Sequence, residues 1–84
     1  MTITIGTSVV RIVNKNTPHV MVYLHTSDTI YIGFNEQKLN YMPTSGFKLP
    51  TDLVVPIDYR GDIFAVSTSA NQELEVLLIP DEGQ

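Results

Sequence analysis

Alternation of apolar and polar residues with a period of two, in short runs separated by turn residues, is the feature that most limits the fold of this 84-residue chain. Side chains alternate between the two faces of a β-strand, so such runs predict strands with one buried face. The densest run is residues 28–34, in which Ile30, Ile32 and Phe34 share one face. β-Branched and aromatic residues favour this half-buried, pleated position.

The preceding run, residues 19–25, alternates in the same way and is joined to residues 28–34 by a short polar segment. A brief polar connection between two alternating runs is typical of a β-hairpin. In that hairpin Tyr23 would lie opposite Tyr31. The sequence therefore predicts that these two strands are neighbours at the centre of the fold.

Further strands are expected on either side of this pair, because helical periodicity is nearly absent and turn residues recur at regular intervals. They are residues 2–5, 8–14, 38–42, 53–57, 62–68 and 73–79, with residues 35–37 expected as a polar turn. Many short strands at such spacing are typical of all-β sandwiches and barrels. We therefore predict an all-β fold, a small antiparallel β-sandwich or barrel that is jelly-roll-like, with about seven or eight short strands and no significant helix.

The apolar side chains that alternation directs inward form the predicted core. These are Val10, Ile12, Val20, Val22, Leu24, Ile30, Ile32, Phe34, Ile63, Ala65, Leu74, Val76 and Leu78. The two central strands contribute six of them, so the prediction places the middle of the core there.

The length predicts one β domain over residues 1–84. We expect residues 1–7 to be an arm or an edge strand and residues 80–84 a flexible acidic tail. A domain of this size buries only about 60% of the surface that its unfolded chain exposes. It contains no cysteine, so neither disulfides nor a cysteine metal site can stabilise it. Association with a partner is the remaining common means of stabilisation.

Charge excludes several classes of partner. Five Lys and Arg residues against nine Asp and Glu residues give a net charge of −4. An acidic chain without a basic cluster is not typical of proteins that bind nucleic acid or an anionic membrane. No apolar run approaches the roughly 20 residues of a membrane span, and the first residues do not resemble a signal peptide. We expect a soluble protein that is not exported, with no nucleic-acid and no membrane partner.

No residues have the spacing of a catalytic or metal site. His19 and His25 are six residues apart on one predicted strand, about 20 Å, so they cannot share a metal; solvated or capping roles are expected. Asp52, Asp58 and Asp62 lie at turns, where Asp usually bonds its own backbone. Nucleophile-elbow serines and glycine-rich phosphate loops are absent. We therefore expect no enzymatic activity, no cofactor and no metal.

The tripeptide Arg60-Gly61-Asp62 is the sequence that integrins recognise. Three residues recur by chance, and Gly-Asp at the start of a strand is ordinary turn chemistry. A structural role is therefore the preferred interpretation.

Seven segments within residues 8–79 resemble, in their order and spacing, a known family. They are Ile12–Asn14, Val20–Leu24, Ile30-Tyr31-Ile32-Gly33, Ser45-Gly46-Phe47-Lys48-Leu49-Pro50, Leu53–Ile57, Gly61-Asp62-Ile63-Phe64-Ala65-Val66 and Glu75–Leu78. Together they are similar to the small β-sandwich virion proteins of tailed bacteriophages. One departure is Pro50-Thr51-Asp52, which stands where these proteins usually carry a Gly-rich turn, so the loop there is expected to differ.

The resemblance implies a virion structural protein on the capsid surface, made in the host cytoplasm, and most of all a capsid decoration or cement protein. It implies non-covalent binding to the major capsid protein, frequently as a homotrimer, and it offers no catalytic residues. Two alternatives remain open. One is a tail or head-fibre receptor-binding module. The other is a small carbohydrate-binding β domain, whose aromatic face would need Tyr23, Tyr31, Tyr41 and Tyr59.

The last two predicted strands, residues 62–68 and 73–79, are expected to pair across the loop 69–72. Their outer face would then hold one contiguous apolar patch, and such patches usually mark interaction sites. The predicted interface, with a sister subunit about a threefold axis or with the shell, comprises Phe64, Val66, Leu77, Ile79, Tyr23 and Tyr31. The alternative is that Met1–Gly6 folds back over the patch within one chain.

Overall fold

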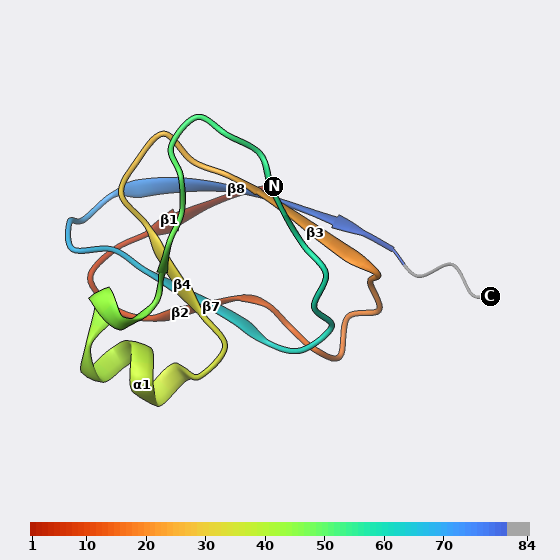
Figure 1. Ribbon diagram of the computed structural model, residues 1–84, viewed down its shortest axis with the longest axis horizontal. Helices are drawn as coiled ribbons and strands as arrows, with labels where there is room; N and C mark the ends of the chain where they lie inside the picture. Colours follow the sequence, from red (N-terminus) through yellow and green to blue (C-terminus); the bar gives the residue numbers. More distant parts are fainter. Residues whose placement is uncertain (81–84) are drawn as a thin grey trace.

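The computed structural model describes residues 1–80, which form two four-stranded antiparallel sheets with a short helix on one outer face (Figure 1). The strands are β1 (Thr2–Ile5), β2 (Val10–Val13), β3 (Met21–His25), β4 (Tyr31–Gly33), β5 (Phe47–Lys48), β6 (Val55–Ile57), β7 (Ile63–Val66) and β8 (Gln72–Ile79). The helix α1 (Glu36–Tyr41) and the 3₁₀ turn η1 (Pro43–Ser45) lie between β4 and β5. The predicted all-β class is confirmed. The predicted tail, except for Pro80, falls outside the described residues.

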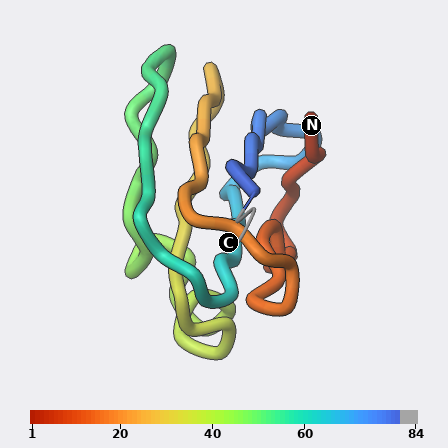
Figure 2. The backbone as a smooth tube through the Cα atoms, turned by 90° about the vertical axis from the view of Figure 1, so that its right-hand side faces the viewer, coloured from red at the N-terminus to blue at the C-terminus, as the bar shows by residue number. Residues whose placement is uncertain are grey.

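The strands pair as one long hairpin rolled up on itself. Sheet A has the order β1-β8-β3-β6 and sheet B the order β2-β7-β4-β5. The chain thus pairs β1 with β8, β2 with β7, β3 with β6 and β4 with β5, which is the jelly-roll arrangement. Figure 2 shows sheet A from teal β6 at the left, through orange β3 and blue β8, to red β1 at the right edge.

The predicted central hairpin is wrong, because β3 and β4 belong to different sheets. The polar segment between them crosses the sandwich and is tied to β8 instead. Thr26 donates its hydroxyl to the carbonyl oxygen of Glu73 (2.7 Å), and the Asp28 carboxylate accepts the Glu73 N–H (2.8 Å). Tyr23 therefore lies opposite Leu77 rather than Tyr31.

The predicted pairing of the last two strands is wrong for the same reason, since β7 lies in sheet B and β8 in sheet A. The connection is fixed across the gap between the sheets. Ser67 donates its N–H to the carbonyl oxygen of Gly6 (2.8 Å) and its hydroxyl to that of Thr29 (2.6 Å). Asn71, with φ of 60°, then turns the chain into β8. Asn tolerates this left-handed conformation better than most residues.

The core lies between the sheets and contains most of the residues predicted for it. The buried set is Ile5, Ile12, Val13, Val22, Leu24, Ile30, Ile32, Leu49, Ile63, Ala65, Leu74 and Val76. Val10 and Leu78 pack against it and are partly buried. Phe34 was predicted inward but is 51% exposed, because β4 ends one residue earlier, at the open side of the sandwich. Val20 precedes β3 and is only partly buried.

The helix α1 occupies residues for which a polar turn and a weak strand were predicted. Asn35 caps it, because its side-chain oxygen accepts the N–H of Lys38 at 3.0 Å. Leu39 is the single buried residue of the helix and packs on Phe64 and Val66 of β7. A helix of six residues is too short to be stable alone, so this contact holds it in place.

Two loops at one end of the sandwich are joined by His19, which is buried rather than solvated. Its Nδ1 lies 2.7 Å from the carbonyl oxygen of Thr17, and its Nε2 lies 2.9 Å from that of Tyr59. The ring can donate to one carbonyl as neutral imidazole and to both as imidazolium. His19 thus connects the segment before β3 with the segment before β7.

Replacing Leu39 with Ala should destabilise the domain by about 2–4 kcal/mol, because it removes the side chain that covers Phe64 and Val66. Tyr41→Ala in the same helix is the matched control, since Tyr41 is 85% exposed, and should change stability by less than about 0.5 kcal/mol. Urea unfolding followed by circular dichroism measures both. Equal effects of the two substitutions would contradict the packing described for α1.

Candidate interaction surface

The six residues predicted as one interface lie on two different outer faces. Tyr23, Leu77 and Ile79 belong to the outer face of sheet A, while Tyr31, Phe64 and Val66 belong to the outer face of sheet B. The predicted contiguous patch is therefore not formed, because it depended on pairing β7 with β8.

Phe64 and Val66 are not available to a partner. They are 8% and 1% exposed, beneath α1, in a cluster with Leu39 against which Tyr31 also packs. The prediction that they form an intersubunit contact is corrected accordingly. The alternative is also wrong, since Met1–Gly6 does not fold over them but supplies the edge strand beside β8.

The outer face of sheet A carries an apolar row that no helix or strand of the described chain covers, although three of its five residues are half-buried. Tyr23 lies between Pro56 of β6 and Leu77 of β8, and Met21 lies opposite Ile79. We call these five residues the sheet A face. Leu77 is 56% exposed, whereas its neighbour Val76 points inward and is 2% exposed. A shallow cavity of about 370 Å³, lined in part by Met1 and Val54, adjoins Tyr23 and Leu77.

The charges beside the sheet A face are acidic. Glu73 and Glu75 alternate with the inward residues of β8, and His25 lies opposite Glu75. No strand of sheet A contains Lys or Arg. The cations in regular elements are on the other side of the molecule, in β2, α1 and β5. A surface complementary to the sheet A face is therefore apolar at its centre and basic at its margin.

A second exposed apolar region lies at the open side of the sandwich, between the edge strands β5 and β6. Phe34 and Phe47, 51% and 56% exposed, line a groove of about 450 Å³ together with Val55 and Ile57. The Phe34 ring also contacts that of Tyr59, with centroids 4.3 Å apart. The sequence prediction missed this groove. The groove could have been predicted from Gly33, which ends the strand β4 and leaves Phe34 outside it.

The four tyrosines proposed for an aromatic face lie in four different places. Tyr23 is on the sheet A face, Tyr31 packs beneath α1, Tyr41 is exposed on α1, and Tyr59 contacts Phe34. They do not form a common platform. Any aromatic recognition site must therefore use the phenylalanine groove instead.

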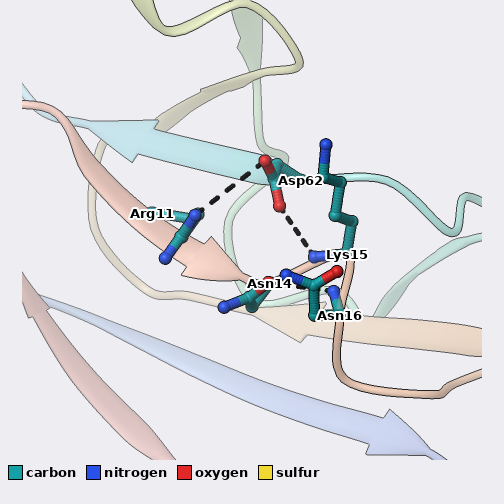
Figure 3. A network of polar contacts seen from close by, with 5 residues as sticks. All are labelled: Arg11, Asn14, Lys15, Asn16 and Asp62. Carbon is teal, nitrogen blue, oxygen red and sulfur yellow. Dashed lines mark hydrogen bonds and ion pairs between the residues drawn. The ribbon is translucent and has the colours of Figure 1, made fainter.

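The Arg60-Gly61-Asp62 segment has a structural role, as Figure 3 shows for its aspartate. The Asp62 carboxylate accepts the backbone N–H of Lys15 (2.7 Å) and lies 4.0 Å from the Arg11 guanidinium. A Cβ on Gly61 would come within 2.6 Å of the Tyr59 hydroxyl. The segment thus anchors the loop after β2 to the start of β7.

Within residues 1–80, no group of three or more His, Cys, Asp or Glu side chains is arranged to hold a metal ion. No helix in this part of the chain is long and apolar enough to cross a membrane. Comparison with protein-family models, with curated proteins and with solved structures finds no significant match to this chain.

Replacing Asp62 with Ala should cost about 1–2 kcal/mol of stability, because a charged acceptor of a backbone N–H is lost. Arg11→Ala is the comparison: it removes the ion pair and the half-buried stem of Arg11 but keeps the hydrogen bond to Lys15, and should cost less than about 1 kcal/mol. Thermal melting of the two variants measures the difference. Equal effects of the two substitutions would show that the ion pair, not the hydrogen bond, anchors the loop, because Asp62→Ala removes both contacts.

Proposed function

We propose that this chain is a structural protein of a bacteriophage virion, a capsid decoration or cement protein that binds the major capsid protein non-covalently. The ordered segments that resemble such proteins support the proposal. The jelly-roll topology adds support by analogy only, since viral capsid proteins, lectins and cupins share it. The observation that carries the proposal is the apolar row of Tyr23 and Leu77 on the outer face of sheet A, in which Leu77 is exposed and Tyr23 half-buried.

The polar groups of the interior favour a protein that binds through its surface. Every buried side-chain nitrogen or oxygen in residues 1–80 has a hydrogen-bond partner. The buried hydroxyls of Thr26 and Ser67 and the ring of His19 all bond to backbone carbonyls that hold crossing segments. These interior groups are engaged in holding the fold, which leaves recognition to the exposed faces.

The size of the sheet A face determines how strongly one copy can bind. The whole outer surface of sheet A, four strands about 4.8 Å apart and about five residues long, measures about 300 Å², and the five residues of the sheet A face occupy only part of it. A standard protein interface buries about 800 Å² on each partner. Val54, which is 56% exposed and lines the adjoining cavity with Tyr23 and Leu77, extends the apolar surface beyond the sheet. A single copy on this face is thus a weak binder, and stable attachment requires several copies on a repeating lattice.

The test is co-sedimentation with heads assembled from the major capsid protein encoded in the same genome. Wild-type protein should sediment with the heads, and Leu77→Glu should lower its affinity at least about tenfold, because it puts an acidic side chain into the apolar row, beside Glu73 and Glu75 on the same face of β8. Tyr41→Glu on the opposite side is the matched control and should bind as wild type. Unchanged binding of Leu77→Glu would exclude the sheet A face as the docking surface.

The phenylalanine groove supports a second candidate function, carbohydrate recognition, as in a receptor-binding module. Exposed aromatic rings in a groove suit the apolar faces of sugar rings. If this function holds, the protein binds a defined class of glycan on an array, and Phe34→Ala with Phe47→Ala removes the binding. Tyr23→Ala is the control and should leave it intact. Failure to bind any glycan on the array would reject this candidate.

A further inference from the structure

The four edge strands of the two sheets differ in how well they are protected from pairing with another chain. Natural edges are blocked by Pro, by charged side chains, by bulges or by short length. β6 contains Pro56, β5 has two residues and contains Lys48, and β2 contains Arg11 beside a register shift. β1, Thr2-Ile3-Thr4-Ile5, carries none of these features. It is the unprotected edge of the molecule.

The backbone of β1 presents unpaired groups at this edge. Met1 and Val76 exchange hydrogen bonds of 2.8 and 3.1 Å. Along an antiparallel pair of strands, directly opposite residues alternate between hydrogen-bonded and non-hydrogen-bonded positions. Ile3, two residues after Met1, is therefore also hydrogen-bonded to β8. The backbone N–H and C=O groups of Thr2 and Thr4 point away from β8. Both threonines are exposed, and β8 is the only described strand paired with β1. Figure 2 shows β1 at the outer edge of its sheet.

We propose that β1 pairs antiparallel with β1 of a second copy, about a twofold axis at Ile3. The sequence Thr-Ile-Thr-Ile is self-complementary in this register. Thr2 lies opposite Thr4 of the second copy, and these are the residues whose backbone groups point outward, so each pair exchanges both of its hydrogen bonds. Cross-strand threonine pairs are themselves favourable. Ile3 meets its symmetry mate on the inner side of the joined sheet.

Charge opposes this pairing only weakly, although each copy has a net charge of −4. β1 has no charged residue, and the nearest acidic side chains, Glu73 and Glu75, belong to β8, although the Glu75 carboxylate accepts the hydroxyl of Thr2. Across the axis the two β8 strands are three strand spacings apart, about 14 Å. The Glu75 carboxylates lie closer to the axis than the β8 backbones, because each bonds to Thr2. They are exposed charges, which salt screens with a Debye length of about 8 Å at physiological ionic strength, so added salt strengthens pairing.

The twofold axis of such a pair is perpendicular to the sheet, so both sheet A faces point the same way. Joining the copies doubles the outer surface of sheet A presented in one direction to about 600 Å², with one sheet A face in each half. This consequence rests on the proposed docking function, but the strand pairing does not. Edge pairing and capsid binding are therefore tested separately.

Sedimentation equilibrium of the purified protein, up to millimolar concentration, tests the pairing. Wild type should form dimers, and Thr4→Pro should weaken them at least about tenfold, because proline removes an N–H that points outward while the bonds of β1 to β8 remain. Thr4→Val keeps the N–H and should dimerise as wild type. A monomeric or trimeric wild type, or dimers of Thr4→Pro as stable as those of wild type, would overturn the proposal.

Cross-linking tests the register in a chain that has no cysteine of its own. Ile3→Cys should oxidise to a covalent dimer, because the two introduced thiols face each other at the axis. Thr2→Cys is the matched control and should not cross-link, since the two Thr2 positions lie diagonally, about 7–8 Å apart. If Ile3→Cys fails to fold, the variant Thr2→Cys with Thr4→Cys must cross-link instead. Equal cross-linking of Ile3→Cys and Thr2→Cys would exclude this register.

Discussion

The apolar contact between the two sheets is the constraint on which the rest of the structure depends. Each strand has at least one apolar face, and packing the two sheets together removes the inner faces from water. Val22 and Leu24 of β3 therefore pack against Ile30 and Ile32 from the facing sheet, and the two segments are not neighbours within one sheet. The chain must cross between sheets at nearly every connection, and the buried hydroxyls of crossing segments compensate for the polar backbone that this buries.

Alternation in the sequence determined which side chains are buried but not which strands are neighbours. A hairpin of β3 and β4 and a jelly roll bury the same faces of Val22, Leu24, Ile30 and Ile32, so the pattern favours neither. What distinguishes them is the bonding of the short polar segment between the strands. Asp28 accepts an N–H from β8, a contact between residues far apart in the sequence that no local pattern shows.

The short helix was missed because period-two reasoning took precedence over local helix signals. Asn35 is a good N-cap, and Glu, Gln, Lys and Leu, which follow it, are strong helix formers. The missed helix also made the predicted interface wrong, because Leu39 of the helix covers Phe64 and Val66. A strand with two apolar faces, such as β7, must be covered on both sides, and α1 of the same chain covers its outer face.

The same principle explains why part of the site could be predicted from sequence. Leu77, Leu78 and Ile79 are consecutive, so β8 is apolar on both faces near its end whichever strands flank it. Leu78 packs against the core, whereas Leu77 on the other face of β8 is exposed, and no helix or strand of residues 1–80 lies over it. The rolled hairpin also places the first strand beside the last, so the row with Leu77 and the open edge of β1 lie in one sheet. Surface recognition and strand pairing can therefore act on the same sheet without competing, because one uses its face and the other its edge.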